Sequence, residues 1–492
     1  MEVVVQHKKS HIHPEDSSDQ GAPTRKSLAL LLVLLVAQLM VILDITAVNI
    51  ALPSLADDLQ LSGSQVSWTI TSYSLVFGSL LLFGGRAADL LGRRRLFLTG
   101  LGVFTAASLA SAAAGSAGVL FAARAGQGLG AAMLSPAALS IITSCFHGQA
   151  KAKALAAWGA VGGAGAAIGV VAGGLLTELA DWRMIFFVNL PVAVALTVGA
   201  LKVVPADAEK PRWRGLDLRG AAVATTSLGA IVYAITQGAS AGWTSTQTLG
   251  FALAGLAGLA GFGVLETRTD KPLLNVERLA DRAVGGGLFL MLAAAGSIFG
   301  LFFLCSVYLQ NVLGTSPLMT GLAFIPLALA AGIGAHAAGH VVARHGVRMP
   351  LASAFAIAAV GMALLAHVGA NGTYLRNILP GMLVAGFGLG IAVVSVSIAI
   401  LTGAREEESG MISGLNSTGH EIGGTIGIAV FSTIAAGSGA LGGAEAASAI
   451  SHAFAAAGLL ASVASITAFF VLPQATHFLA KFRLNPASLP VH

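Results

Sequence analysis

The stretch Gly85-Arg-Ala-Ala-Asp-Leu-Leu-Gly-Arg-Arg-Arg95 lies between two long apolar segments, near 65–84 and 96–114. Four arginines in so short a connection predict that it lies on the cytoplasmic side of a membrane. Gly85 and Gly92 allow helix ends to approach closely, and Asp89 can pair with an arginine or with a helix N-terminus. The plain alternative is an anchor alone, but the spacing of the glycines and the aspartate favours a further role.

The composition of the chain is that of a membrane protein. It has 492 residues, of which 55% are hydrophobic and only 10% charged, and its mean hydropathy is +0.82. Soluble proteins carry about 25% charged residues, so this sequence predicts a polytopic membrane protein. The pI near 9.4 does not indicate a nucleic-acid partner, because the basic residues lie mainly in short loops between apolar segments.

The apolar segments predict an all-α protein with fourteen transmembrane helices. They lie near 28–52, 65–84, 96–114, 118–142, 154–177, 184–204, 218–238, 248–266, 284–309, 318–342, 349–369, 375–401, 409–435 and 449–472. With the N-terminus inside, every Lys and Arg except Arg124, Arg183 and Arg376 falls on the cytoplasmic side. We therefore expect a multi-pass protein of the cytoplasmic (inner) membrane with both termini in the cytoplasm.

Glycine spacing indicates an internal repeat. Gly85 and Gly92 recur as Gly339 and Gly346, and the fourth segment's glycines recur in the twelfth. The predicted division begins with a disordered cytoplasmic tail (1–26) and a six-span bundle (27–204). Cytoplasmic linkers with two extra spans follow (205–283), and then a second six-span bundle (284–472) and a cytoplasmic tail (473–492).

Asp44 lies inside the first apolar segment, where a carboxyl group is costly enough to indicate function. At 100° per residue, Gln38 and Asn49 lie about 20° apart and share one face of this helix, and Asp44 projects away from it. We interpret Asp44 as a proton-binding group, and Gln38 and Asn49 as candidate residues of a substrate cavity. The alternative is a structural aspartate that caps a kink or bonds a neighbouring span.

The fourth segment contains Arg124, which must find a partner, a carbonyl group or water inside the membrane. Gln127 lies on the same helical face and is a further candidate cavity residue. We interpret Arg124 as a group that tunes the proton affinity of a nearby carboxylate. The alternative is that its side chain snorkels to the membrane interface.

The thirteenth segment carries a polar face, with Glu421 beside it as a second deep carboxyl group. That face contains Ser413, Asn416, Ser417, His420, Gly424 and Gly427. We assign Asn416 and His420 to the candidate cavity and Glu421 to proton coupling. A protonated glutamate that bonds across helices is an equally plain interpretation of Glu421.

Several of these stretches resemble known motifs. Residues 85–95 are similar to the G-x-x-x-D-x-x-G-R-R loop of the major facilitator superfamily, and residues 120–132 to its fourth-span motif. Residues 43–53, Leu-Asp-Ile-Thr-Ala-Val-Asn-Ile-Ala-Leu-Pro, closely resemble the L-D-x-T-x-V-N-x-A-L-P signature of its fourteen-span drug:proton antiporters of the EmrB/QacA type. In the similar fifth-span motif, Val170 stands where the family has a proline.

The resemblance implies the major facilitator fold, with two six-helix bundles and two extra central spans. It implies a secondary active transporter for multidrug efflux and antibiotic resistance, in which the proton motive force drives export of lipophilic drugs, cations among them. In that family the loop after the second span latches the two halves, and the matching residues here are Gly85, Asp89, Gly92, Arg93 and Arg94.

Other functions remain to be weighed. An uptake symporter for a small organic solute is the closest rival, and a membrane receptor or sensor is the alternative outside transport. An enzyme is not expected, because no cluster of acid, base or metal-binding residues is evident. The expected partners are a drug-like small molecule, protons and the lipid bilayer, with no nucleic acid, cofactor or metal, and the expected state is a monomer.

Overall fold

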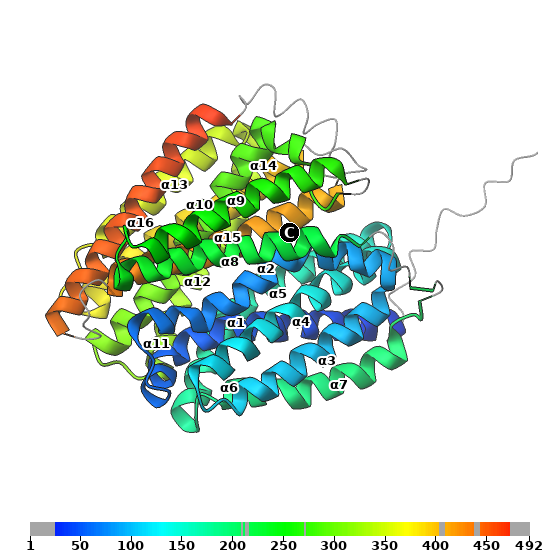
Figure 1. Cartoon of the computed structure of the whole chain (residues 1–492), viewed down its shortest axis with the longest axis horizontal. Helices are drawn as coiled ribbons and strands as arrows, with labels where there is room; N and C mark the ends of the chain where they lie inside the picture. The colour runs from blue at the N-terminus through cyan, green and yellow to red at the C-terminus, as the bar shows by residue number, and fades with distance from the viewer. Residues whose placement is uncertain are drawn as a thin grey trace, which may run out of the picture.

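The computed structural model describes residues 25–207, 210–211, 216–269, 272–402, 409–436 and 443–472. Every regular element in these ranges is a helix, which confirms the predicted all-α class. The helices form two bundles that face each other across a seam (Figure 1). The predicted tails lie almost wholly outside the described residues.

The N-terminal bundle contains six membrane-length segments, and its closest pairs are α2 with α4, α3 with α4, and α1 with α5. The sixth segment bends at Val188, so that one apolar segment forms two helices. The helices are α1 (Arg25–Asp58), α2 (Gly63–Leu91), α3 (Arg93–Ala112), α4 (Ala117–Cys145), α5 (Gly148–Leu179), α6 (Met184–Phe187) and α7 (Asn189–Val203).

The C-terminal bundle repeats this arrangement with irregular helix ends. One apolar segment bends at Phe324 and so forms two helices, α11 and α12. The Ser316 side chain caps the first of them by accepting from Met319 N. The helices are α10 (Arg282–Val307), η2 (Tyr308–Val312), α11 (Pro317–Ala323), α12 (Ile325–His345), α13 (Arg348–Leu365), η3 (Tyr374–Ile378), α14 (Leu379–Thr402), α15 (Ser409–Ala436) and α16 (Gly443–Val471).

The two extra segments form a helical hairpin, α8 (Leu218–Ala241) and α9 (Thr246–Arg268), followed by the short helix η1 (Val276–Ala280). Asp217 and Ser245 cap the two hairpin helices through their side chains. α8 packs on both α2 and α15, as Figure 1 shows, and therefore covers the seam between the bundles, whereas α9 packs mainly on α8.

Thirteen helices in the described ranges are long and apolar enough to cross a membrane. They correspond to thirteen of the fourteen predicted spans. The remaining one, predicted at 409–435, forms the helix α15, but its polar face keeps it outside that set. α15 packs against α10, α2, α16 and α8 like a central bundle helix. The fourteenth span itself stays a prediction.

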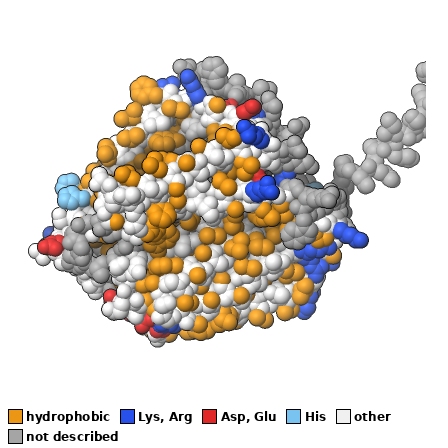
Figure 2. Space-filling view, in the orientation of Figure 1, with side chains coloured by type: hydrophobic (Ala, Val, Ile, Leu, Met, Phe, Trp, Pro, Cys, Tyr) orange, Lys and Arg blue, Asp and Glu red, His pale blue; other side chains and the backbone are white. Residues whose placement is uncertain are grey.

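The surface agrees with a membrane environment. In Figure 2 hydrophobic side chains cover the middle of the visible face, whereas Lys and Arg gather mainly near one end of the molecule. Most exposed large hydrophobic residues lie on helices at the outside, and α9 is the least buried of the candidate spans. Such a belt would be unfavourable in water but suits lipid.

Glycines allow the closest helix crossings. Gly427 of α15 lies directly against Gly296 of α10, where any side chain would overlap backbone atoms. Gly84 of α2 lies in the same way against the backbone at Ala132 of α4. Close backbone approach of this kind is how helices associate in lipid, where burial of apolar surface gives little driving force.

The two bundles are joined at the end of the molecule opposite the 85–95 loop. Ser306 Oγ donates to Asn49 O at 2.8 Å, and Gln310 Nε2 donates to Ile50 O at 3.0 Å. Next to them, Gly321 of α11 lies against the carbonyl group of Val170, which is fully buried. The residue that replaces the motif proline therefore belongs to the closed end of the seam.

We expect Gly427→Ala to destabilise the protein by about 1–3 kcal/mol, because the added methyl group would overlap the Gly296 backbone. Thermal unfolding in detergent measures the effect. The matched control is Gly261→Ala in α9, where a Cβ meets no atom within 4 Å among the described residues. Equal transition temperatures for the two variants would contradict this packing.

Candidate functional site

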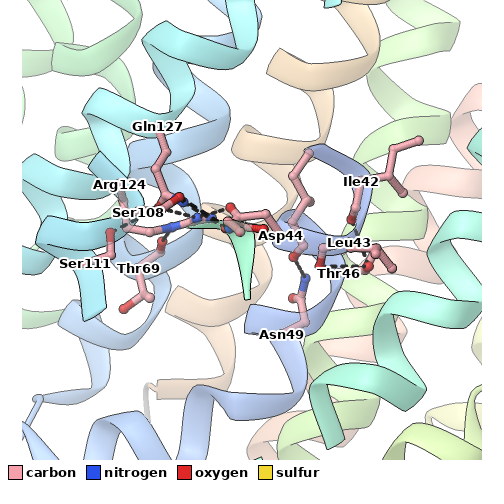
Figure 3. Close-up of polar contacts among 12 residues, drawn as sticks. Ile42, Leu43, Asp44, Thr46, Asn49, Thr69, Ser108, Ser111, Arg124 and Gln127 are labelled. Carbon is pink, nitrogen blue, oxygen red and sulfur yellow. Dashed lines mark hydrogen bonds and ion pairs between the residues drawn. The ribbon is translucent and has the colours of Figure 1, made fainter. Parts of the chain in front are cut away.

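Asp44 of α1 lies at the centre of a buried polar network (Figure 3). Arg124 of α4 donates through Nη1 to Asp44 Oδ2, and both side chains are wholly shielded from solvent. The structure thus brings together two residues that the sequence placed in separate spans. The guanidinium does not snorkel to an interface, because it is fully enclosed by the N-terminal bundle.

Two amide side chains complete the coordination of the carboxylate. Gln127 Nε2 donates to Asp44 Oδ1 at 2.8 Å, and Asn189 Nδ2 donates to the same oxygen at 3.0 Å. Both amides also donate to Ser108 Oγ, and Ser111 Oγ donates to Gln127 Oε1 at 3.1 Å. Every hydrogen-bond partner of the carboxylate among the described residues is a nitrogen donor, which suits an ionised carboxylate, an acceptor only.

Arg124 is held from several directions. Its Nε donates to Thr69 O at 3.1 Å, and its Nη1 also donates to Gln127 Oε1 at 3.0 Å. Its Cζ lies 4.5 Å from the centre of the Tyr73 ring, within the range of a cation–π interaction. A planar guanidinium can make these contacts at once, whereas a lysine ammonium group cannot.

The pairing links charge to conformation. Removing one partner of a buried ion pair costs about 3–5 kcal/mol, because the other charge is left uncompensated. A proton on Asp44 would have this effect on Arg124. The pair therefore ties the packing of α1 and α4 to the charge of these two side chains.

A cavity of about 1040 Å³ lies between the two bundles. Its walls come from α1, α2, α4, α5, α10, α14 and α15, and from Pro272 and Leu273 in the segment before η1. It extends to the end of the molecule that carries the 85–95 loop, where Gly85, Arg86 and Asp89 line it. Apolar lining residues such as Phe77 and Trp158 suit a lipophilic ligand.

Glu421 belongs to this cavity and not to the Asp44 network. Its Oε1 lies 3.3 Å from Nδ1 of His420, whose ring meets Phe299 edge-on. Its Oε2 is buried and has no hydrogen-bond partner among the described residues. The two deep carboxyl groups therefore have different surroundings, one saturated with donors and one half-satisfied.

The five predicted cavity residues divide into two groups. Gln38, Asn416 and His420 line the cavity. Asn49 lies outside it, at the closed end of the seam, where its Nδ2 donates to Ile45 O at 3.0 Å. Gln127 belongs to the Asp44 network instead.

Residues 85–95, expected to be a loop, instead form the last turns of α2, a sharp turn at Gly92 and the start of α3, and this segment is held within its own bundle. Asp89 pairs with Arg93 at 3.4 Å, and both side chains are substantially exposed. Arg94 Nη2 donates to Leu201 O at the end of α7, at 2.9 Å. Gly85 meets no atom within 4 Å at its Cβ position among the described residues, so it does not serve here as a close-contact glycine.

Asp207 fixes the start of α3, although no pattern in the sequence indicates this role. Its carboxylate accepts from Arg94 N at 3.1 Å and from Arg95 N at 3.0 Å. Gly92 adopts φ +103°, and a Cβ there would meet the Asp207 carboxylate. Gly92 is thus required both by its backbone conformation and by the acid that caps the helix.

Several residues of the network were not assigned to a site from sequence. Asn189 lies in the Trp182–Pro191 stretch, which the sequence suggested to be an anchor and helix start. Trp182 does anchor, since its Nε1 donates to Asp58 Oδ2 at 3.2 Å. A signal for Ser108 and Ser111 was available, because polar residues three apart in an apolar span share one helical face.

No group of three or more His, Cys, Asp or Glu side chains that could hold a metal ion occurs within the described ranges. His336 and His340, one turn apart on α12, have ring centres 5.3 Å apart.

We expect Asp207→Asn to loosen the first turn of α3 by about 1–2 kcal/mol, because a carboxylate at a helix N-terminus is lost. Hydrogen exchange of the Arg94 and Arg95 amides should accelerate about tenfold, while α1 is unchanged. Asp181→Asn at the opposite end is the control. Unchanged exchange at both amides would show that Asp207 does not cap the helix.

Comparison with known proteins agrees with the fold and with the motifs. The sequence profile described as Major Facilitator Superfamily matches residues 34–428. The puromycin resistance protein pur8 of Streptomyces alboniger is 39% identical over 432 residues, which cover 87% of this chain and 85% of that protein. The cephamycin export protein CmcT of Amycolatopsis lactamdurans is 35% identical over 410 residues, covering 82% and 84% of the two chains.

Solved structures show the same fold at low sequence identity. A D-xylose–proton symporter aligns with a TM-score of 0.65 and 15% identity, covering 91% of this chain and 98% of its own. A bacterial homologue of the human lysosomal transporter Spinster, in an inward-facing and unoccupied conformation, aligns with a TM-score of 0.61 and 15% identity, covering 94% and 99%. The chain belongs to the major facilitator superfamily.

Proposed function

We propose that the protein exports lipophilic small molecules of the antibiotic type across the cytoplasmic membrane in exchange for protons. The names of the relatives support export of antibiotics. A large, mostly apolar cavity between two bundles supports transport by alternating access. The observation that carries the proposal is the sealed Asp44–Arg124 pair, a proton-titratable contact next to that cavity.

The arginine-rich 85–95 loop supports a cytoplasmic position for its end of the molecule, and hence for both termini. The cavity then opens to the cytoplasm, and the seam at Asn49 and Ile50 closes the outer side. With this orientation, we assign the arrangement to an inward-open state, which accepts a substrate from the cell.

In this state Asp44 is an ionised group paired with Arg124, as expected after a proton has left for the cytoplasm. When the cavity faces outward, Asp44 takes up a proton and releases Arg124. The cost of that unpaired guanidinium favours the return to the inward-open state. Glu421 is the second acidic group of the proposed coupling mechanism, and it lines the cavity in which the substrate would bind.

The energy available is sufficient for export. One proton that crosses the membrane potential gains about 2.3 kcal/mol per 100 mV, which sustains a gradient of tens-fold for a neutral substrate. The sequence contains no G-x-x-x-x-G-K-[ST] phosphate-binding loop. We therefore expect the driving force to be an ion gradient and not ATP hydrolysis.

The test uses purified protein in proteoliposomes with puromycin and ethidium as probes. An imposed proton gradient should drive both probes uphill, whereas a sodium gradient alone should not. Asp44→Asn should abolish uphill transport, at least about 100-fold, because the proton-binding group is lost.

The control for that variant is Asp57→Asn, which makes the same substitution at an exposed position of the same helix. Uphill transport by correctly inserted Asp44→Asn would refute the role of Asp44. Proton-driven accumulation in the direction of proton flow would establish uptake symport instead, and transport on sodium alone would change the coupling ion.

We further propose that Gly85, Asp89, Gly92, Arg93 and Arg94 act as a latch that stabilises the closed cytoplasmic side. Asp89 lines the mouth of the open cavity and is exposed there, so it is free to meet the other bundle on closure. Asp89→Asn and Arg93→Ala should therefore slow turnover several-fold while leaving probe binding within about twofold. Asp181→Asn, at the opposite end of the molecule, is the control. Weaker probe binding with normal turnover would contradict the latch.

A further inference from the structure

Tyr73 of α2 is a fully buried residue that none of the roles above explains. Its ring lies against the Arg124 guanidinium, with 4.5 Å between Cζ and the ring centre. Its hydroxyl group is buried and has no hydrogen-bond partner in the described part of the chain. Buried tyrosine hydroxyl groups are nearly always bonded, so one that is not calls for a functional explanation.

The unsatisfied groups around Tyr73 form a cluster. Arg124 Nη2 and Thr69 Oγ1 are likewise buried without a partner among the residues described. Arg124 Nη2 belongs to the guanidinium that contacts the Tyr73 ring, and Thr69 is one turn before Tyr73 on α2. Three polar atoms beside one buried ion pair mark a polar site in an otherwise apolar bundle.

Tyr73 also connects the two deep carboxyl groups. Its ring contacts Arg124 of α4, the ion-pair partner of Asp44 of α1. The helices α2 and α15 are in direct contact near this point, because Gly78 lies against the side chain of Glu421. Tyr73 thus lies between a sealed acid and an acid of the cavity wall.

The sealed acid needs such a connection. Asp44 is 1% exposed and does not line the cavity, although its neighbour Ile45 does. Glu421 does line it, and so does Phe77, one turn after Tyr73, whose ring centre is 5.7 Å from that of Tyr73. The stretch of α2 that carries Tyr73 and Phe77 therefore runs from the Asp44–Arg124 pair to the cavity.

We propose that Tyr73 is the proton gate of this transporter, a positioning residue that holds Arg124 against Asp44 with its ring and relays the proton between Asp44 and Glu421 through its hydroxyl group. The proposal rests on the proton-coupled function stated above and adds the residue through which coupling occurs.

The relay conserves atoms and charge. In the protonated state, in which Arg124 has released Asp44, the Tyr73 hydroxyl group turns to Asp44 and its oxygen accepts that proton, while the hydroxyl proton of Tyr73 moves on to the Glu421 carboxylate. O–H bonds break at Asp44 and Tyr73, and O–H bonds form at Tyr73 and Glu421, so tyrosine ends unchanged and nothing is oxidised or reduced. Asp44 is left ionised and paired with Arg124, as observed.

The test separates the ring of Tyr73 from its hydroxyl group. Tyr73→Phe keeps the ring over Arg124 and removes only the oxygen. In proteoliposomes with ethidium or puromycin, this variant should lose at least about tenfold of proton-driven transport. Exchange of the same probe at equal pH, which requires no net proton release, should stay within about twofold.

A second measurement needs no substrate. After a jump to higher pH, a pH-sensitive dye measures the protons that the purified protein releases. The protons that wild type releases and Asp44→Asn does not are assigned to Asp44. Tyr73→Phe should release the same number of protons at least about tenfold more slowly. Tyr73→His, which restores a proton-carrying ring, should recover much of the rate.

The matched control is Tyr308→Phe, which removes another buried tyrosine hydroxyl group, one that donates to Gly369 O at 2.6 Å. It should leave proton release unchanged. Wild-type release and transport by Tyr73→Phe would overturn the gate even if Asp44→Asn is inactive. If Asp44→Asn keeps full proton release and uphill transport, the proposed function fails instead, so the two failures are distinguishable.

Discussion

A charge inside a lipid bilayer must be paired, and this constraint organises the N-terminal bundle. Asp44 and Arg124 lie in different helices, with neither side chain exposed to solvent. Each is tolerable only because the other is present. Asn189 of α7 donates to the carboxylate, and Ser108 of α3 accepts from both amides, so four helices meet in one polar network. The bundle is built around this contact, which in the proposed mechanism a proton on Asp44 breaks.

In the proposed mechanism, that contact controls transport only if the bundles move against each other. At the closed end, the bundles meet through backbone carbonyl groups at Asn49 and Ile50 and through the small residue Gly321. Apolar residues of α1 and α10 also belong to one buried cluster there, so opening this end has to break hydrogen bonds and expose apolar surface. At the other end, polar residues such as Asp89 line the cavity and are exposed.

The sequence predicted the fold well because membrane insertion depends on local properties. Apolar length and basic loops located thirteen spans, and only α15, with its polar cavity face, falls short of the hydropathy of the others. The site was predicted in part. Asp44, Arg124 and Glu421 stood out because ionisable groups are rare in spans. Periodicity on one helix cannot show which helices meet, so Gln127 was assigned to the cavity and Asn189 to an anchor. Asp207 lies outside any periodic segment, and only its position against Gly92 reveals it.

The extra hairpin shows how an insertion can serve the same design. α8 covers the seam between α2 and α15, next to the helix that carries Glu421. Glu266 at the end of α9 accepts from Leu274 N at 2.8 Å, which fixes the segment that follows. That segment contributes Pro272 and Leu273 to the cavity wall, and Asn275 N reaches Met411 Sδ of α15. Because one element contacts the seam, the cavity wall and α15 together, a movement of one bundle against the other would have to displace the hairpin or break these contacts.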